Sequence, residues 1–181
     1  MDKSTLFNMA LSLIGGGDYT SDSGHARVCE LWYPVVLREA ACRCNWTFSR
    51  RKATLKPNPD GTYTLPSDCM NILYLREGQQ QPETLLIVGR HIYTSATAPL
   101  NLVYTSSDIA DLQELPNESP EFCVGTAYLL AARIARTVAG DMSTADTCEQ
   151  HAEIQFQKAV TRDTQQEHSN KTLTTFANKR R

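Results

Sequence analysis

The segment from Phe122 to Ala139 constrains the fold more than any other part of this sequence, because it is apolar on nearly every face of a helix. Its few polar side chains are Thr126, Arg133, Arg136 and Thr137. Ser119 as a cap and Pro120 at the first helical position form a strong start signal, and Gly140 ends the helix. A helix that is apolar almost all round lies at the centre of its fold, or it is shared with a neighbouring subunit.

Apolar residues at helical spacing predict three more helices. The first ends at Gly15-Gly16-Gly17, and the second runs from a cap at Asp22 or Ser23 to about Cys44. The last helix follows Gly140, and we expect it to end near Thr161, where its stripe of apolar residues stops.

Between residues 53 and 106 the pattern changes to short apolar runs separated by glycine, proline or polar loops, which indicates strands. The expected strands are Tyr63–Leu65, Asn71–Leu75, Leu85–Val88, His91–Thr94 and Leu100–Tyr104. A short basic run, residues 50–52, precedes them. It is interpreted as a solvated turn, with phosphate contact as the minority alternative.

These elements predict an α+β fold that is mainly α. Residues 1–52 and 107–161 are expected to form a four-helix bundle, and residues 53–106 a small antiparallel β module inserted between helices 2 and 3. Residues 162–181 are expected to form an extended C-terminal tail. A chain of 181 residues is long enough for one good core.

The expected tail has almost no core-forming surface. It carries five Lys or Arg and two acidic residues, whereas the whole chain has a net charge of −2. Its apolar residues are Leu173, Phe176 and Ala177, and it ends with Lys179, Arg180 and Arg181. Such a segment buries too little surface to offset its ordering entropy. Two interpretations stay open: a frayed terminus without a role, or a segment that becomes ordered on a partner.

Composition excludes several classes of protein. An isoelectric point near 6.1 argues against a dedicated nucleic-acid-binding surface. The chain has no apolar run close to the roughly 20 residues that a membrane span needs, so no membrane association is expected. The start, residues 1–4, lacks the basic region of a signal peptide, and we expect assembly in the cytoplasm. The six cysteines are therefore expected to be free thiols.

No local signature of catalysis is present. Gly15-Gly16-Gly17 follows a helix rather than a strand and lacks the lysine of a phosphate loop. The four histidines are scattered, and Cys42-Arg43-Cys44 has no second pair to complete a zinc site. Glu114, Glu118 and Glu121 raise the possibility of general acid chemistry, but a capping role near Ser119 explains them better. We therefore predict no catalytic residues, no metal and no cofactor.

A series of short motifs between Ala10 and about Val160 is more specific in its order and spacing than any one motif alone. In chain order they are Ala10-Leu11 with Ile14-Gly15, Cys29, Tyr33-Pro34, Trp46-Thr47-Phe48, Tyr63-Thr64-Leu65-Pro66-Ser67-Asp68-Cys69, Leu102-Val103-Tyr104 with Asp108-Ile109, Pro120-Glu121-Phe122 and Leu130–Ala135. With these motifs the chain resembles the head-to-tail adaptor family of short-tailed bacteriophages, also called tail tubular protein A or the gatekeeper. Ser49 departs from the pattern, since an alanine is commoner there.

The signature residues of the resemblance are Trp46, Phe48, Tyr63, Pro66 and Asp68. Each also has a plain structural interpretation. The two aromatic residues at 46 and 48 suit a helix-to-sheet corner, and the aspartate suits a local turn.

The resemblance implies a structural protein of the virion, assembled in the host cytoplasm. Copies of the chain would form a ring, dodecameric in this family, between the portal protein and the tail nozzle or hub protein. DNA would cross the channel with transient and unspecific contact. The tail would bind the portal through Leu173 and Phe176 as apolar anchors and through the basic side chains of Lys179, Arg180 and Arg181.

Three other functions remain as alternatives. Some members of this broad group have been associated with peptidoglycan hydrolysis, so a cell-wall-hydrolysing tail accessory protein is one. A head-closure protein of a long-tailed phage is the second, although a β module of about fifty residues favours the short-tailed type. A nucleic-acid-binding module is the third, and the charge balance disfavours it.

Overall fold

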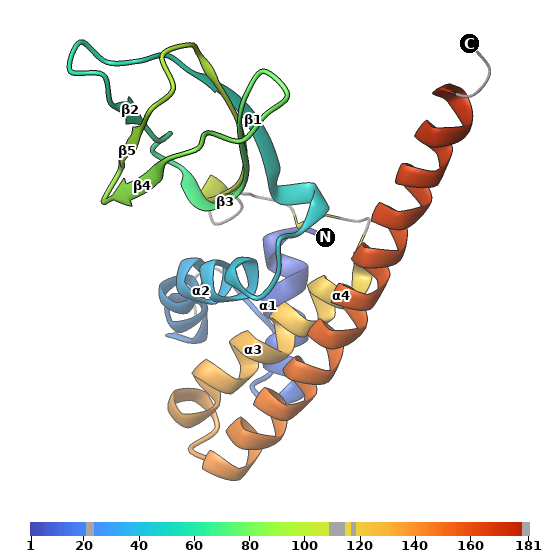
Figure 1. Cartoon of the computed structure of the whole chain (residues 1–181). Coiled ribbons are helices and arrows are strands. Elements are labelled where there is room, and N and C mark those ends of the chain that lie inside the picture. Colours follow the sequence, from blue (N-terminus) through green and yellow to red (C-terminus); the bar gives the residue numbers. More distant parts are fainter. Residues whose placement is uncertain (21–23, 109–114, 117–118, 179–181) are drawn as a thin grey trace. The chain divides into compact units, whose positions relative to one another are not determined.

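The structure is a computed structural model that describes residues 1–20, 24–108, 115–116 and 119–178, with side chains as far as residue 166. It divides into two compact units (Figure 1). The helical unit comprises residues 1–47 and 109–181, and the β unit comprises residues 48–108. Within the described part of the chain, every helix is too short or too polar to cross a lipid bilayer.

The helical unit is organised around α3 (Pro120–Val138). Three other helices pack against it: α1 (Lys3–Leu13), α2 (Gly24–Cys42) and α4 (Met142–Asn178). Pairs of helices that exclude α3 make little contact with one another. The helices therefore surround one central helix instead of forming the expected four-helix bundle, in which each helix also packs against its neighbours.

Burial in α3 explains its apolar sequence. Its fully buried side chains come from every side of the helix and include Phe122, Ala127, Leu129, Leu130, Ala131, Ile134 and Ala135. The single chain covers this surface by itself. The apolar character of α3 therefore gives no reason to expect a contact with another subunit along it, and of the two sequence interpretations the central helix is the correct one.

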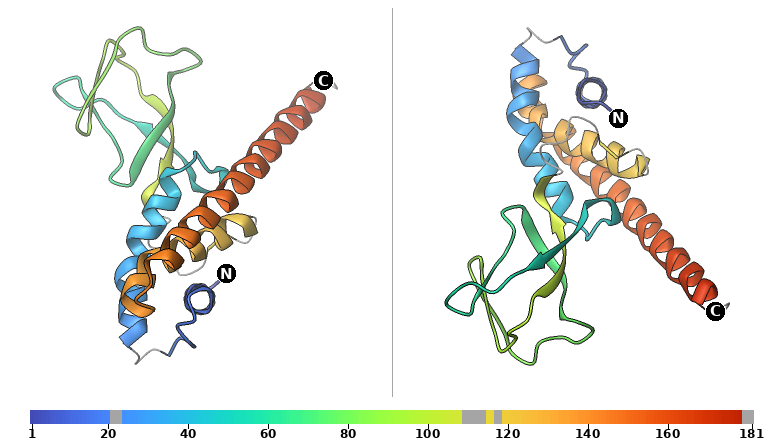
Figure 2. Two further views of the ribbon diagram at one scale, coloured as in Figure 1. Left: turned by 90° about the horizontal axis from the view of Figure 1, so that it is seen from below. Right: turned by 90° about the horizontal axis from the view of Figure 1, so that it is seen from above.

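α3 and α4 form an antiparallel hairpin whose two helices lie side by side (Figure 2). Gly125 of α3 permits their close approach. A Cβ atom added there would lie 3.1 Å from a ring carbon of Phe156 on α4. Close packing of the hairpin thus depends on glycine at position 125, which has no side chain, as well as on apolar residues.

The β unit contains six strands in two antiparallel three-stranded sheets. One sheet has the order β1-β6-β3, and its strands are Arg50–Leu55, Leu100–Ser106 and Cys69–Glu77. The other has the order β2-β5-β4, and its strands are Tyr63–Thr64, His91–Thr94 and Leu85–Val88. A shared core includes Tyr63, Ile92, Leu100 and Leu102.

The fold-class prediction is therefore wrong. The described part of the chain forms four helices and two three-stranded antiparallel sheets, in place of a four-helix bundle with one small β module. The basic run Arg50–Lys52 is also not a turn, because it forms the first half of β1 and pairs with Val103–Thr105 of β6.

The extended C-terminal tail is a further error, because α4 continues to Asn178. From Asp141 to Arg181 the sequence contains neither glycine nor proline. Loss of the apolar stripe near Thr161 changes what the helix can pack against. It does not stop the backbone hydrogen bonding, since glutamine, glutamate, lysine and arginine are good helix formers.

Candidate functional site

Trp46 lies at the centre of the helical unit. Its side chain is fully buried, and its indole N–H donates to the carbonyl oxygen of Ala40 at 3.0 Å. The ring packs edge-on against Phe122, with 5.1 Å between centroids, and Phe122 in turn contacts Phe156. Trp46 thus joins the end of α2 to the α3–α4 hairpin. Phe48 is half-buried and begins the β unit.

Tyr63 and Pro66 organise the β unit. Tyr63 is fully buried in β2, and its hydroxyl donates to the carbonyl oxygens of Ala98 at 2.7 Å and Ala96 at 3.2 Å. The carbonyl oxygen of Pro66 accepts hydrogen bonds from the Cys69 amide and from the Arg90 side chain. These contacts fix loops, and they leave no reactive group free.

Asp68 connects the start of β3 to β6. Its carboxylate accepts hydrogen bonds from the Ser106 hydroxyl at 2.7 Å and from the Tyr104 hydroxyl at 2.9 Å. Its carbonyl oxygen accepts from the Ser107 amide at 2.8 Å. The local turn expected from the sequence is thus only part of its role, because the side chain reaches across to another strand.

The electrostatics of this network keep Asp68 ionised. Burial opposes ionisation, but the hydrogen bonds from Ser106 and Tyr104 outweigh it and hold the pKa of Asp68 below its ordinary value. Burial and the adjacent carboxylate raise the pKa of Tyr104 to about 12. An ionised acid that accepts from two hydroxyls, neither of which is a good acid, is suited to a structural bond and not to proton transfer.

Arginine and glutamate side chains join three helices of the helical unit. Glu39 of α2 accepts from Arg133 of α3 at 3.0 Å and from Arg43 at 3.3 Å. Arg43 also pairs with Glu153 of α4, and its guanidinium lies 4.8 Å from the centre of the Phe156 ring. A pocket of about 370 Å³ adjoins this cluster. Since carboxylates already surround Arg43, the pocket has no spare positive charge for an anionic ligand.

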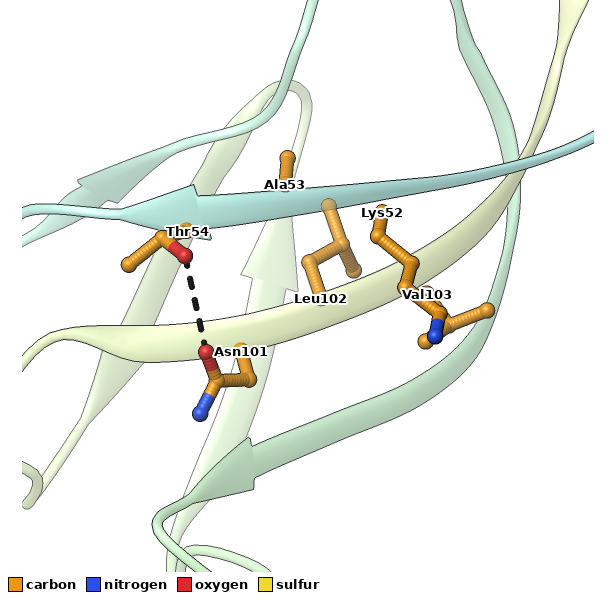
Figure 3. Close-up of a pocket in the computed structure, with 6 residues that line it drawn as sticks. All are labelled: Lys52, Ala53, Thr54, Asn101, Leu102 and Val103. Carbon is orange, nitrogen blue, oxygen red and sulfur yellow. Dashed lines mark hydrogen bonds between the residues drawn. The ribbon is translucent and has the colours of Figure 1, made fainter.

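A second hollow of about 370 Å³ lies in the β unit, on the neighbouring strands β1 and β6. Three cross-strand pairs line it: Lys52 with Val103, Ala53 with Leu102, and Thr54 with Asn101 (Figure 3). The last pair is joined by a hydrogen bond of 3.5 Å between side chains. Among the described residues of the lining only Lys52 is ionisable, and a single ionisable group does not make a pair for acid–base chemistry.

Residues that could carry other chemistry are dispersed. Among the described residues, no three His, Cys, Asp or Glu side chains are grouped so as to hold a metal ion. His151 stacks on Tyr128, and His25 contacts the carbonyl oxygen of Gly16. The six cysteines are not joined by disulfide bonds. Glu121 forms an ion pair with Arg162, and Glu114 and Glu118 lie outside the described residues.

The predicted portal-binding residues lie at the end of α4 or beyond it. Leu173 and Phe176 are in the last turns of the helix. Lys179, Arg180 and Arg181 lie outside the described residues. The basic end of the chain therefore follows a helix and not an extended tail.

The start of this region is anchored to the helical unit, which the sequence did not predict. Asp163 is buried, and its carboxylate accepts from the Thr47 hydroxyl at 2.6 Å and from the Thr47 amide. The preceding residue, Arg162, pairs with Glu121 at the beginning of α3. Beyond this point α4 extends past the end of its partner helix, and Thr164, Gln165 and Gln166 are exposed. We call residues 164–178 the arm.

Strand β4 was also predicted correctly in extent, but its exposure was missed. All four of its residues, Leu85, Leu86, Ile87 and Val88, are exposed, and so is Tyr93 on the neighbouring β5. Four consecutive apolar residues are typical of a strand buried on both faces. No local sequence signal marks this exposure, because it follows from the position of β4 at the edge of its sheet.

In comparisons with known proteins, no family model matches the chain, and no curated protein matches it significantly.

Proposed function

We propose that the chain is a structural head-to-tail adaptor of a bacteriophage virion, located in the neck and assembled in the host cytoplasm. Copies would form a ring, with twelve as the expected number, between the portal protein and the tail nozzle or hub protein. The motif order from Ala10 to about Val160 supports this proposal. It is also consistent with the arrangement of the signature residues, all of which serve packing or hydrogen bonding.

The observation that carries the proposal is the arm. A helix in water gains most of its stability from packing an apolar face against other elements. The arm extends past α3 by roughly 22 Å, taking about 1.5 Å for each of its residues, and its first residues are exposed. A polar helix of this kind has little to stabilise it alone, so we infer that a partner binds it.

The portal protein is the proposed partner of the arm. Leu173 and Phe176 would be its apolar anchors, and Lys179, Arg180 and Arg181 would meet acidic or carbonyl groups. Single contacts of this size are weak. In a ring of twelve copies the contacts add by avidity, so weak individual binding suffices.

The same ring would surround the path of the genome. Residues before the arm carry most of the acidic side chains of the chain, and the whole chain has a net charge of −2. A surface that does not concentrate positive charge binds phosphate weakly. Contact with DNA would therefore be transient and unspecific, as passage of DNA requires.

The test is to compare the intact chain with a variant truncated after Gln166, each alone and mixed with the portal protein of the same virus. Native mass spectrometry should detect a portal complex with about twelve copies of the intact chain, as the dodecameric ring requires. Truncation should abolish the complex and leave the melting temperature nearly unchanged, because Asp163 and Arg162 are retained. Undiminished binding by the truncated chain would rule out the arm as the portal-binding element.

A further inference from the structure

The four strand edges of the two sheets differ in how they are protected against pairing with another chain. β1 begins with three basic residues, Arg50–Lys52, and β3 has two irregularities in its pairing with β6. β2 has only two residues. Charge, irregularity and shortness each discourage a further strand from adding to an edge. β4 has none of these features.

β4 is regular and uncharged, and it is apolar on both sides. It pairs with β5 in unbroken register from Leu85↔Thr94 to Val88↔His91. Leu86 and Val88 are 58% and 55% exposed. Leu85 and Ile87 lie on the opposite face. Ile87 pairs with the buried Ile92 of β5, yet both Leu85 and Ile87 are exposed. An exposed apolar edge of this kind is normally covered by another strand.

Hairpin geometry determines which backbone groups of β4 are available. The turn between β4 and β5 has two residues, with Gly89 at a φ of 60° in its first position, as a tight hairpin requires. In such a hairpin the closing pair, Val88 and His91, exchanges hydrogen bonds, and so does every second pair after it. The N–H and C=O groups of Leu85 and Ile87 therefore point outward, toward the open edge.

We propose that this edge binds β4 of a second copy of this chain, in an antiparallel pair about a two-fold axis. The flanking charges favour this occupant. Glu83 precedes the strand and Arg90 follows it. Antiparallel pairing of two copies brings the acid of each near the base of the other, whereas parallel pairing would place like charges together. The Arg90 side chain donates to carbonyl oxygens of residues 65–67, which are neutral, so its charge is not cancelled.

One register of the two β4 strands best pairs the outward-pointing N–H and C=O groups of Leu85 and Ile87. With Leu86 opposite Leu86 of the second copy, Leu85 of each copy faces Ile87 of the other, and both of these pairs can exchange hydrogen bonds. Glu83 then lies opposite Gly89 and beside Arg90 of the second copy. The two sheets become one sheet of six strands that ends on both sides in the two-residue β2, so no apolar edge remains.

This pairing does not rest on the proposed function, and the two can fail separately. A two-fold pair uses the same surface on both copies, whereas a ring of copies facing one way uses two different surfaces. Dimerisation through β4 would therefore keep the free chain from joining the ring until the dimer dissociates. A chain that dimerises but does not bind a portal, or the reverse, would separate the two proposals.

The experiment is sedimentation velocity of the full chain from low to high micromolar concentration, because an interface of this small size should be weak. We expect conversion from monomer to dimer across this range. Ile87→Lys places a charge in the paired edge and should weaken dimerisation about tenfold or more. Leu31→Lys, at an exposed apolar residue of α2, is the matched control and should leave dimerisation unchanged.

A cross-link tests the register. In the proposed pair the Cα atoms of the two copies of residue 86 lie within disulfide range, so a Leu86→Cys variant should give a linked 86–86 peptide under mild oxidation. Mass spectrometry distinguishes this peptide from links through the native cysteines. A chain that stays monomeric at every concentration, or a dimer that Ile87→Lys leaves intact, would overturn the proposal.

Discussion

Asp163 accepts two kinds of hydrogen bond from Thr47, a residue 116 positions earlier: one from its hydroxyl at 2.6 Å and one from its backbone amide at 3.2 Å. This contact holds the segment that follows Trp46 against the middle of α4. It explains why a residue in the most polar part of the sequence is buried, since its charge has donors that replace water.

Replacing Asp163 by alanine should therefore destabilise the helical unit by about 1–3 kcal/mol, because the donors of Thr47 lose their acceptor. Urea unfolding followed by tryptophan fluorescence is a suitable measurement, since Trp32 and Trp46 both lie in the helical unit. Asp146→Ala, at an exposed acid of the same helix, should change stability by less than about 0.5 kcal/mol. Equal effects of the two variants would mean that the Asp163 contact contributes nothing specific.

A charge in the centre of α3 should unfold the helical unit. Ala131 is completely buried, and Ala131→Glu would place an unpaired carboxylate among apolar side chains, at a cost of several kcal/mol. Circular dichroism of the dilute protein should show the loss of helix. Thr137→Glu, an exposed position of the same helix, should cost less than about 1 kcal/mol. A stable Ala131→Glu monomer that fails only to assemble would contradict the central position of α3.

We expect the protein with glycine at position 125 to be more stable than a variant with alanine there, which is the reverse of the usual preference in helices. Alanine normally gains about 1 kcal/mol over glycine inside a helix. At this site the new methyl group would lie 3.1–3.3 Å from Phe156 and Gln155, and Phe156 is held between Phe122 and Arg43. We expect Gly125→Ala to lower the melting temperature, and an increase would show that α4 can move away without loss.

The Asp68 network should make the β unit sensitive to acid. The pKa of Asp68 is lowered in the folded chain, so its stabilising contribution is complete above the ordinary value of 3.8 and is lost as the pH falls through the folded value. Hydrogen-exchange protection factors of β6 should be higher in the wild type than in Asp68→Asn at neutral pH. The difference should shrink below about pH 4. A difference that does not depend on pH would exclude ionisation of Asp68 as its source.

The rival function, cell-wall hydrolysis, can be tested directly. We expect pure protein to give no cleared band in a peptidoglycan zymogram, since Asp68, Glu39 and Glu121 all serve structural contacts. Clear hydrolysis that is lost on substituting one Asp or Glu would establish an enzyme and displace the structural proposal.

Local features of this fold were predictable, because they depend on short stretches of sequence. Pro120 opens α3 after Ser119, and β4 and β5 have the bounds read from their apolar runs. Edge strand β1 was missed because half of its residues are basic, a composition that is also typical of a solvated turn. The end of α4 was missed because an apolar stripe reports packing, while a helix stops only where capping or a breaker ends it.

The arrangement of these elements was not predictable in the same way. The strands form two sheets and not one because of the way they pair. This pairing depends on residues distant in sequence, such as Tyr104 and Asp68. The ion pairs of Glu39 with Arg133, and the contact of Thr47 with Asp163, likewise join helices far apart along the chain. No local spacing marks such partners. The exposure of β4 could be judged only once its sheet was known to end there.

The unbroken course of α4 has a mechanical consequence. One helix, without glycine or proline, contains both Phe156 in the core and the residues at its far end. Such a rod has no joint at which the outer half could swivel independently of the inner half. A pull or twist applied near Asn178 would therefore be delivered to the packed rings of Phe156, Phe122 and Trp46, and a load on the end of the chain becomes a load on its centre.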